Sequence, residues 1–203
     1  MFKFVTQLLV FLITVSVTVN VQLCGNQNQQ TVDEAFIESE IVKDLEIKLP
    51  SDGLDLIEVT YPNAICRESV SCGNELKSFQ TLEEPIIKYP SESNTLYTFM
   101  MLDPDALSPA APTLRSYIHW MVINVERDDL KSGSTIHSYI APTPTPLLGA
   151  HRYVFMVFEQ PEKFAVGSDA IVLERNNFNV AEWAERNRVF GPIAGNYFLE
   201  KLP

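Results

Sequence analysis

The chain has 203 residues, a formal net charge of -11, 46% hydrophobic residues and 20% charged residues. This length and composition indicate one folded domain with a sizeable core and exclude an intrinsically disordered chain. The acidic balance repels nucleic acid and anionic membranes, which excludes binding to them through bulk charge. An anionic ligand would have to be held by local hydrogen-bond donors.

The first 23 residues read as a secretory signal peptide. Lys3 is the only charged residue before Asp33, and residues 8–19, LLVFLITVSVTV, are almost entirely apolar. A short basic start and an apolar run of this length are typical of a signal peptide, with an uncleaved membrane anchor as the alternative. We therefore expect a signal peptide at residues 1–23, a leader and helix at 24–53, and a domain at 54–203 of a secreted, extracellular protein.

The chain has three cysteines, at positions 24, 66 and 72. Secretion permits disulfides, and Cys66 and Cys72 enclose only five residues between two candidate strands. We expect these two cysteines to be bridged, with unpaired thiols as the alternative, and Cys24 to be left over or removed. No histidine lies near them, so the pattern does not indicate a zinc site.

The remaining elements follow in chain order. Residues 32–45 carry apolar side chains at helical spacing and predict an amphipathic helix. Strands are predicted at 54–61, 85–89, 96–102, 117–123, 136–140 and 152–160, from alternating or continuous apolar runs. The prolines of residues 141–146, APTPTP, predict a stiff extended loop. Residues 178–188 predict a helix, residues 191–196 a turn and residues 197–203 a short apolar tail.

Polar side chains gather at the starts of two of these strands. The candidates are Asp103 and Asp105 around Pro104, Tyr117 and His119 at the start of one strand, and His151 and Tyr153 at the start of another. Strand alternation places Tyr117 and His119 on one face, and likewise His151 and Tyr153. If the strands are neighbours, these donors converge beside a carboxylate that can orient an imidazole. The pattern predicts a small polar pocket.

These motifs resemble the phosphatidylethanolamine-binding protein family, which includes the Raf kinase inhibitor protein and plant flowering regulators. The resemblance rests on Asp-Pro-Asp-Ala at 103–106, on His119 with Val-Ile-Asn at 122–124, and on His-Arg-Tyr-Val at 151–154. It spans about residues 54–198. It implies a mainly β, single-domain antiparallel β-sandwich with a few peripheral helices and an anion pocket for phosphate or a phospholipid head group.

Carried over by motif, the resemblance implies that Asp103, His119, His151 and Tyr153 line the pocket, with Tyr117 where the family usually has Trp. Asp105 is expected to serve the hydrogen bonding of its own loop, and Arg152 to pair with a carboxylate.

The sequence departs from the family at the rim of this pocket. Leu107 replaces a proline, and Ala141 and Thr143 stand where glycines are usual. Side chains at these positions narrow the approach to backbone amides, although Thr143 can donate its hydroxyl. The chain also stops at Pro203, where many relatives continue into a helix beside the pocket.

The leading hypothesis is a secreted, monomeric, non-enzymatic binding protein without a cofactor, whose ligand is a phospholipid head group, a phosphate-like anion or a small hydrophobic molecule. The alternatives are a serine protease inhibitor or signalling modulator that binds a protein partner, and a metal-dependent enzyme using Asp103, His119 and His151. No activated nucleophile is recognisable.

Overall fold

A computed structural model describes residues 30–62, 67–165 and 167–202. They form a six-stranded sheet in the order β1-β9-β8-β5-β6-β7 and a three-stranded sheet in the order β3-β2-β4. The strands are β1 (Asp55–Leu56), β2 (Glu58–Tyr61), β3 (Glu68–Ser69), β4 (Ile86–Lys88), β5 (Leu96–Asp103), β6 (Tyr117–Glu126), β7 (Ser134–His137), β8 (His151–Gln160) and β9 (Phe190–Glu200). Every pairing between these strands is antiparallel except that of β1 with β9.

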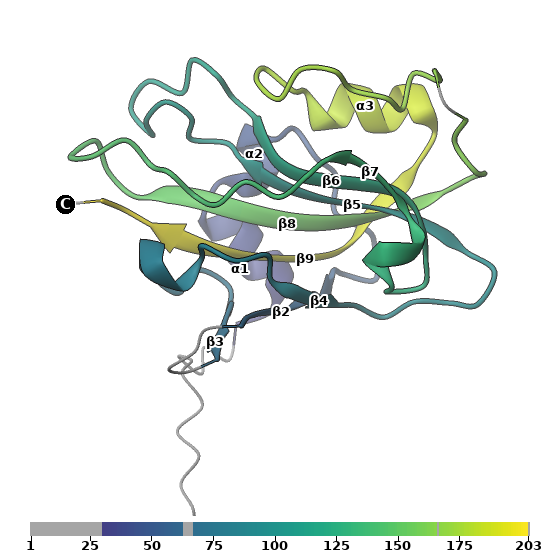
Figure 1. Cartoon of the computed structure of the whole chain (residues 1–203), viewed down its shortest axis with the longest axis horizontal. Helices are drawn as coiled ribbons and strands as arrows, with labels where there is room; N and C mark the ends of the chain where they lie inside the picture. Colours follow the sequence, from purple (N-terminus) through teal and green to yellow (C-terminus); the bar gives the residue numbers. More distant parts are fainter. Residues whose placement is uncertain (1–29, 63–66, 166, 203) are drawn as a thin grey trace, which may run out of the picture.

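The large sheet lies between the helices and the small sheet, as Figure 1 shows for α3 and β2–β4. The helices are α1 (Val32–Glu38), α2 (Ile41–Asp44) and α3 (Val180–Asn187), with 3-10 turns η1 (Ser78–Gln80) and η2 (Leu130–Ser132). Because side chains alternate along a strand, Met156 of β8 packs on the helix side and Phe155 on the small-sheet side. This layering confirms the predicted β-sandwich with peripheral helices. In the described part of the chain, no helix is long and apolar enough to cross a membrane.

The predicted helix at residues 32–45 is wrong in one respect, because it is divided into α1 and α2. Thr31 and Glu34 form a capping box that starts α1, and Glu40 adopts a left-handed conformation with φ 58° that ends the continuous helix. The Ser39 carbonyl at this break accepts a hydrogen bond from Arg152. Sequence periodicity could not reveal this break, because the hydrogen bond to the Ser39 carbonyl comes from a side chain that is distant in the sequence.

The predicted strand at residues 54–61 is also divided. β1 pairs with β9 in the large sheet, whereas β2 pairs with β3 and β4 in the small one. Ile57 lies between them and is fully buried. The segment therefore crosses from one sheet to the other, which its apolar alternation does not indicate.

The turn predicted at residues 191–196 and the tail at 197–203 are wrong, since β9 covers most of both. Gly191 and Pro192 fall where the pairing with β8 is irregular, a position at which a strand tolerates them. Packing requires a glycine at position 195, because a Cβ there would lie 2.6 Å from Cζ of Phe36 in α1. Residues typical of turns therefore occupy a strand that a helix covers closely.

Two predictions concern residues that the structure does not describe. The signal peptide at 1–23 lies outside the described residues, as does Cys66. Cys72 is half-buried and forms no disulfide with another described residue, and burial raises the pKa of its thiol. The Cys66–Cys72 bridge stays a prediction.

Candidate ligand pocket

A cavity of about 250 Å³ opens where β5 ends and where β6 and β8 begin. It is lined by Asp103, Ala106, Leu107, Leu114, Tyr117, His119, Ile140, Thr143, Thr145 and His151. Tyr153 lies against it, since its ring contacts those of His119 and His151, with centroids 5.1 and 6.3 Å away. The structure thus brings together all six predicted ligand-binding residues.

Asp103 and His151 form a buried pair in this cavity. Nδ1 of His151 lies 2.8 Å from Oδ2 of Asp103, and both side chains are almost inaccessible to solvent. A carboxylate accepts, so Nδ1 carries a proton and donates it. The other ring nitrogen, Nε2, is buried without a hydrogen-bond partner among the described residues. Asp103 therefore fixes the His151 ring and leaves Nε2 for a ligand.

His119 is held by backbone rather than by a carboxylate. Its Nδ1 lies 2.8 Å from the Ile140 carbonyl oxygen, which can only accept, and the Ile140 N–H donates to the His119 carbonyl. Burial lowers the pKa of His119, and the Ile140 hydrogen bond and the charge of Asp103 oppose this effect. His119 is therefore predominantly neutral at neutral pH when the cavity is empty.

Tyr153 places a hydroxyl near these rings. Its oxygen is buried and forms no hydrogen bond of normal geometry, although the backbone N–H of Thr143 lies near enough to oppose slightly the rise of its pKa. Burial and the nearby charge of Asp103 raise that pKa well above its ordinary value, so the hydroxyl stays protonated. An unpaired buried hydroxyl is costly, which marks it as a group that a ligand or water would satisfy.

The loop that carries Asp103 is braced by arginines, and Arg152 pairs with a carboxylate as predicted, although the Asp105 side chain was expected to serve its own loop and binds Arg152 instead. The Asp105 N–H donates to Oδ1 of Asp103 at 2.7 Å, and the Asp105 carboxylate accepts from Arg152 at 2.6 and 2.9 Å. Arg152 also reaches Asp44 of α2, and Arg115 joins Asp44 to the Pro104 carbonyl. These contacts fix the position of the Asp103 carboxylate.

The predicted proline-rich loop forms the opposite rim. Thr145 donates its hydroxyl to the Leu107 carbonyl at 2.7 Å, which ties this loop to the one that follows Asp103. Thr143 is exposed at the mouth, with its backbone N–H toward Tyr153. The rim is thus closed by a hydrogen bond where the sequence lacks the usual proline.

Sequence reasoning missed Glu200, a fully buried carboxylate opposite His151 in the pairing of β8 with β9. Its Oε2 accepts from the Thr81 hydroxyl at 2.8 Å, while Oε1 has no partner among the described residues. Burial raises its pKa. The only signal in the sequence was this single acidic residue, within a segment that was predicted to be a short apolar tail.

The charge of the cavity is set by few groups. Within the described residues, none of its lining side chains is Lys or Arg, and no group of three His, Cys, Asp or Glu side chains is placed to hold a metal ion. The donors are imidazoles, the Tyr153 and Tyr117 hydroxyls and the Thr143 amide. The arrangement suits hydrogen bonding to a small polar group.

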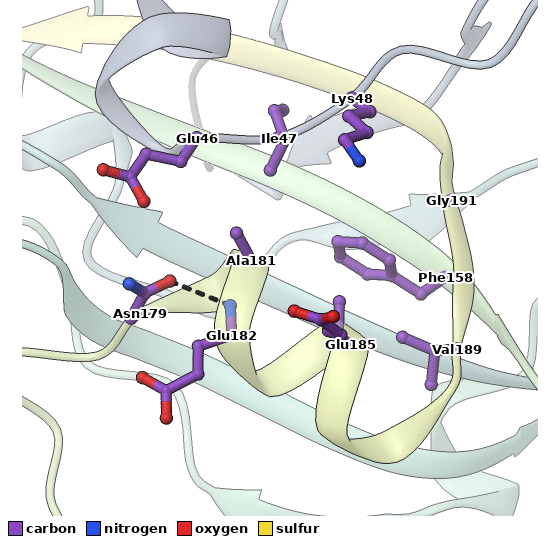
Figure 2. A pocket seen from close by; sticks show the side chains of 11 residues that line it. Glu46, Ile47, Lys48, Phe158, Asn179, Ala181, Glu182, Glu185, Val189 and Gly191 are labelled. Atoms are coloured by element: carbon purple, nitrogen blue, oxygen red, sulfur yellow. Dashed lines mark hydrogen bonds between the residues drawn. The ribbon is translucent and has the colours of Figure 1, made fainter.

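A larger hollow of about 530 Å³ lies between residues 46–48 and α3 (Figure 2). Phe158 lies at its inner side, and Glu185 of α3 stands across from Lys48. The dashed line in Figure 2 is the helix cap, in which Asn179 accepts from the Glu182 N–H at 3.0 Å. None of its lining residues is among the described side chains that have an unpartnered buried polar atom. The hollow therefore shows no unsatisfied buried polar group of the kind found in the pocket beside His151.

Residues 68–198 match the phosphatidylethanolamine-binding protein model. The chain belongs to the phosphatidylethanolamine-binding protein family. The resemblance seen in the motifs is thereby confirmed over most of the domain.

The chain is similar to individual proteins of known sequence or structure. The chain is 32% identical over 169 residues to a 26 kDa secreted antigen of Toxocara canis, covering 80% of this chain but only 62% of the antigen. It is 27% identical to a putative odorant-binding protein A5 of Drosophila melanogaster, over 87% of this chain and 83% of that protein. A carboxypeptidase Y inhibitor, solved with its cognate proteinase, superposes with TM-score 0.73 at 20% identity, over 86% of this chain and 96% of that one. The last similarity establishes the fold alone.

Proposed function

We propose that this protein is a secreted, non-enzymatic binding protein whose pocket takes a phosphate-bearing head group such as phosphoethanolamine. The observation that carries the proposal is the buried His151 Nε2 and Tyr153 hydroxyl, both unpartnered, beside a ring that Asp103 orients. Family membership supports a binding role. The cavity volume of about 250 Å³ suits a head group rather than a whole lipid.

The absence of Lys and Arg from the described lining favours a zwitterion over a free dianion. Phosphate oxygens would accept from His119, His151 and Tyr153, and Asp103 supplies a negative charge that suits an ammonium group. Bound phosphate favours imidazolium, so binding should strengthen as pH falls through the histidine range. Because burial lowers the pKa of His119, this gain should extend below the ordinary value of about 6.5.

Secretion is supported by the apolar run at residues 8–19 and by the similarity to a secreted antigen. The protease inhibitor alternative is not proposed, since the likeness to an inhibitor at 20% identity extends to the fold only.

The test is titration calorimetry of phosphoethanolamine, at pH 5.5 and 7.5, with protein recovered from the medium of secretory cells. His119→Ala and His151→Ala should each weaken binding by about 1.5–3 kcal/mol, the range for hydrogen bonds to charged groups. The double variant should lose less than the sum, because both rings share one ligand.

His137→Leu is the matched control, since His137 is also buried but lies outside this pocket. It should bind phosphoethanolamine like the original protein. No binding at either pH, or an equal loss in the control, contradicts the proposed ligand. Retention of the protein inside the cells contradicts secretion.

A further inference from the structure

β7 is an edge strand of the large sheet (Figure 1). A further cavity lies beside it. This β7 cavity has a volume of about 520 Å³, and its apolar lining comes from Ile123, Ile136, Phe164, Ile171, Val172 and Leu173. Ile123 belongs to the helix-side core, whereas Tyr153 of the first pocket belongs to the small-sheet side. The two cavities therefore open on opposite faces of the sheet.

One buried polar group faces the β7 cavity without a partner. His137 lines it, is only 8% exposed, and has an Nε2 with no hydrogen bond among the described residues. Burial and the charge of Arg175 lower the His137 pKa, whereas the nearby Val172 backbone and the charge of Glu174 oppose this effect. The ring is therefore neutral at neutral pH. In the tautomer that carries its proton on Nδ1, Nε2 presents a lone pair to the cavity.

The other polar groups around this cavity are already engaged. The Asn124 side chain donates to the Phe164 carbonyl at 3.0 Å and accepts from the Phe164 N–H at 2.8 Å. Arg175 donates to backbone carbonyls, including those of Ile118 and Ser138. Ser134 and Thr135 line the cavity but are exposed. The buried part thus offers one acceptor within an apolar surface.

We propose that the β7 cavity binds an apolar alcohol, whose hydroxyl donates to Nε2 of His137 while its hydrocarbon body packs between Phe164 and Ile171. The volume is in the range of small-molecule sites, which are mostly apolar with few placed polar groups. A carboxylate ligand fits less well, because it would require a protonated, desolvated imidazole in a protein of net charge -11. This proposal is independent of the phosphate-binding pocket.

The test is calorimetric titration with decanol and with decyl methyl ether, which keeps the oxygen and the chain but cannot donate. The original protein should bind decanol about tenfold more tightly than the ether, the effect of one neutral hydrogen bond. His137→Leu should remove that preference and leave phosphoethanolamine binding unchanged. From octanol to decanol, affinity should rise about fourfold per methylene.

The position of the ligand is tested with a matched pair of exposed leucines. Leu173 at the mouth of the cavity and Leu147 on the proline-rich loop are both 84% exposed, so neither substitution disturbs the core. Leu173→Asp should weaken decanol binding severalfold, and Leu147→Asp should not change it. Equal binding of alcohol and ether, tighter binding of decanoic acid, an unaffected His137→Leu variant or no binding of decanol would each overturn the proposal.

Discussion

At the scale of single residues, burial shifts the pKa values of two ionisable groups around the candidate ligand pocket in opposite directions. It lowers the pKa of His119 and raises that of Glu200, so it favours the neutral form of both. The position of His119 could be anticipated from its strand motif. Glu200 could not, because its significance depends on being paired opposite His151, which no local sequence pattern encodes.

Glu200 should make the protein less stable as pH rises. Its folded-state pKa is raised, so above the ordinary carboxyl range the unfolded chain releases the proton more readily than the folded one. Stability is therefore lost as pH rises from the unfolded pKa toward the folded one. Glu200→Gln keeps an acceptor for Thr81 and removes the titration. We expect the variant to gain about 1–3 kcal/mol over the original protein between pH 4 and pH 8, the cost of one poorly satisfied buried group.

Urea unfolding at the two pH values measures this difference, and the exposed Glu185→Gln provides the control. The stability difference between Glu200→Gln and the original protein could instead be the same at both pH values. Glu200 would then have the same pKa in the folded and the unfolded state, which contradicts the prediction.

At the scale of elements, β9 marks the limit of prediction from sequence. The apolar strands at the centre of the large sheet, β5, β6 and β8, were predicted correctly because each is buried on both faces and reads as a continuous apolar run. In place of β9 the sequence predicts a turn followed by a tail, because Gly191, Pro192 and Gly195 interrupt the apolar pattern of a strand. Its glycine at 195 is explained only by α1, which lies more than 150 positions earlier in the chain.

Gly195→Ala should loosen the docking of α1 on the sheet. The added Cβ would lie 2.6 Å from the ring of Phe36, which is itself fully buried, so ring or backbone must shift. Overpacking of this kind typically costs about 1–3 kcal/mol. In combination with Phe36→Leu, which frees space at the same point, the loss should be smaller than the sum of the two single losses. Urea unfolding of the four proteins measures the coupling, and strict additivity would show that the two positions do not clash.

At the scale of the whole molecule, one sheet separates two chemically different cavities. The sequence predicted the layered fold and the residues that line the candidate ligand pocket, because both follow from strand alternation and local motifs. It did not predict the β7 cavity, whose walls come from β6, β7 and residues 164–165 and 171–173. Those segments meet only in the folded chain, and the motif in β6 does not indicate a cavity on this face.

The net charge of -11 should give phosphate binding an unusual dependence on salt. The long-range field of the protein repels an anion such as inorganic phosphate, and salt screens that field over about 10 Å at 0.1 M. The hydrogen bonds inside the pocket are short-ranged and buried, so salt affects them less. The association rate of inorganic phosphate should therefore increase between 10 and 150 mM NaCl. An anion site built from basic residues would show the opposite trend, because salt weakens its attraction for phosphate. Zwitterionic phosphoethanolamine, which carries less net charge, should change less. Stopped-flow measurements with both ligands at pH 5.5 test this expectation, and a phosphate association rate that falls with salt would indicate a positive local field at the pocket mouth that outweighs the charge of the whole chain.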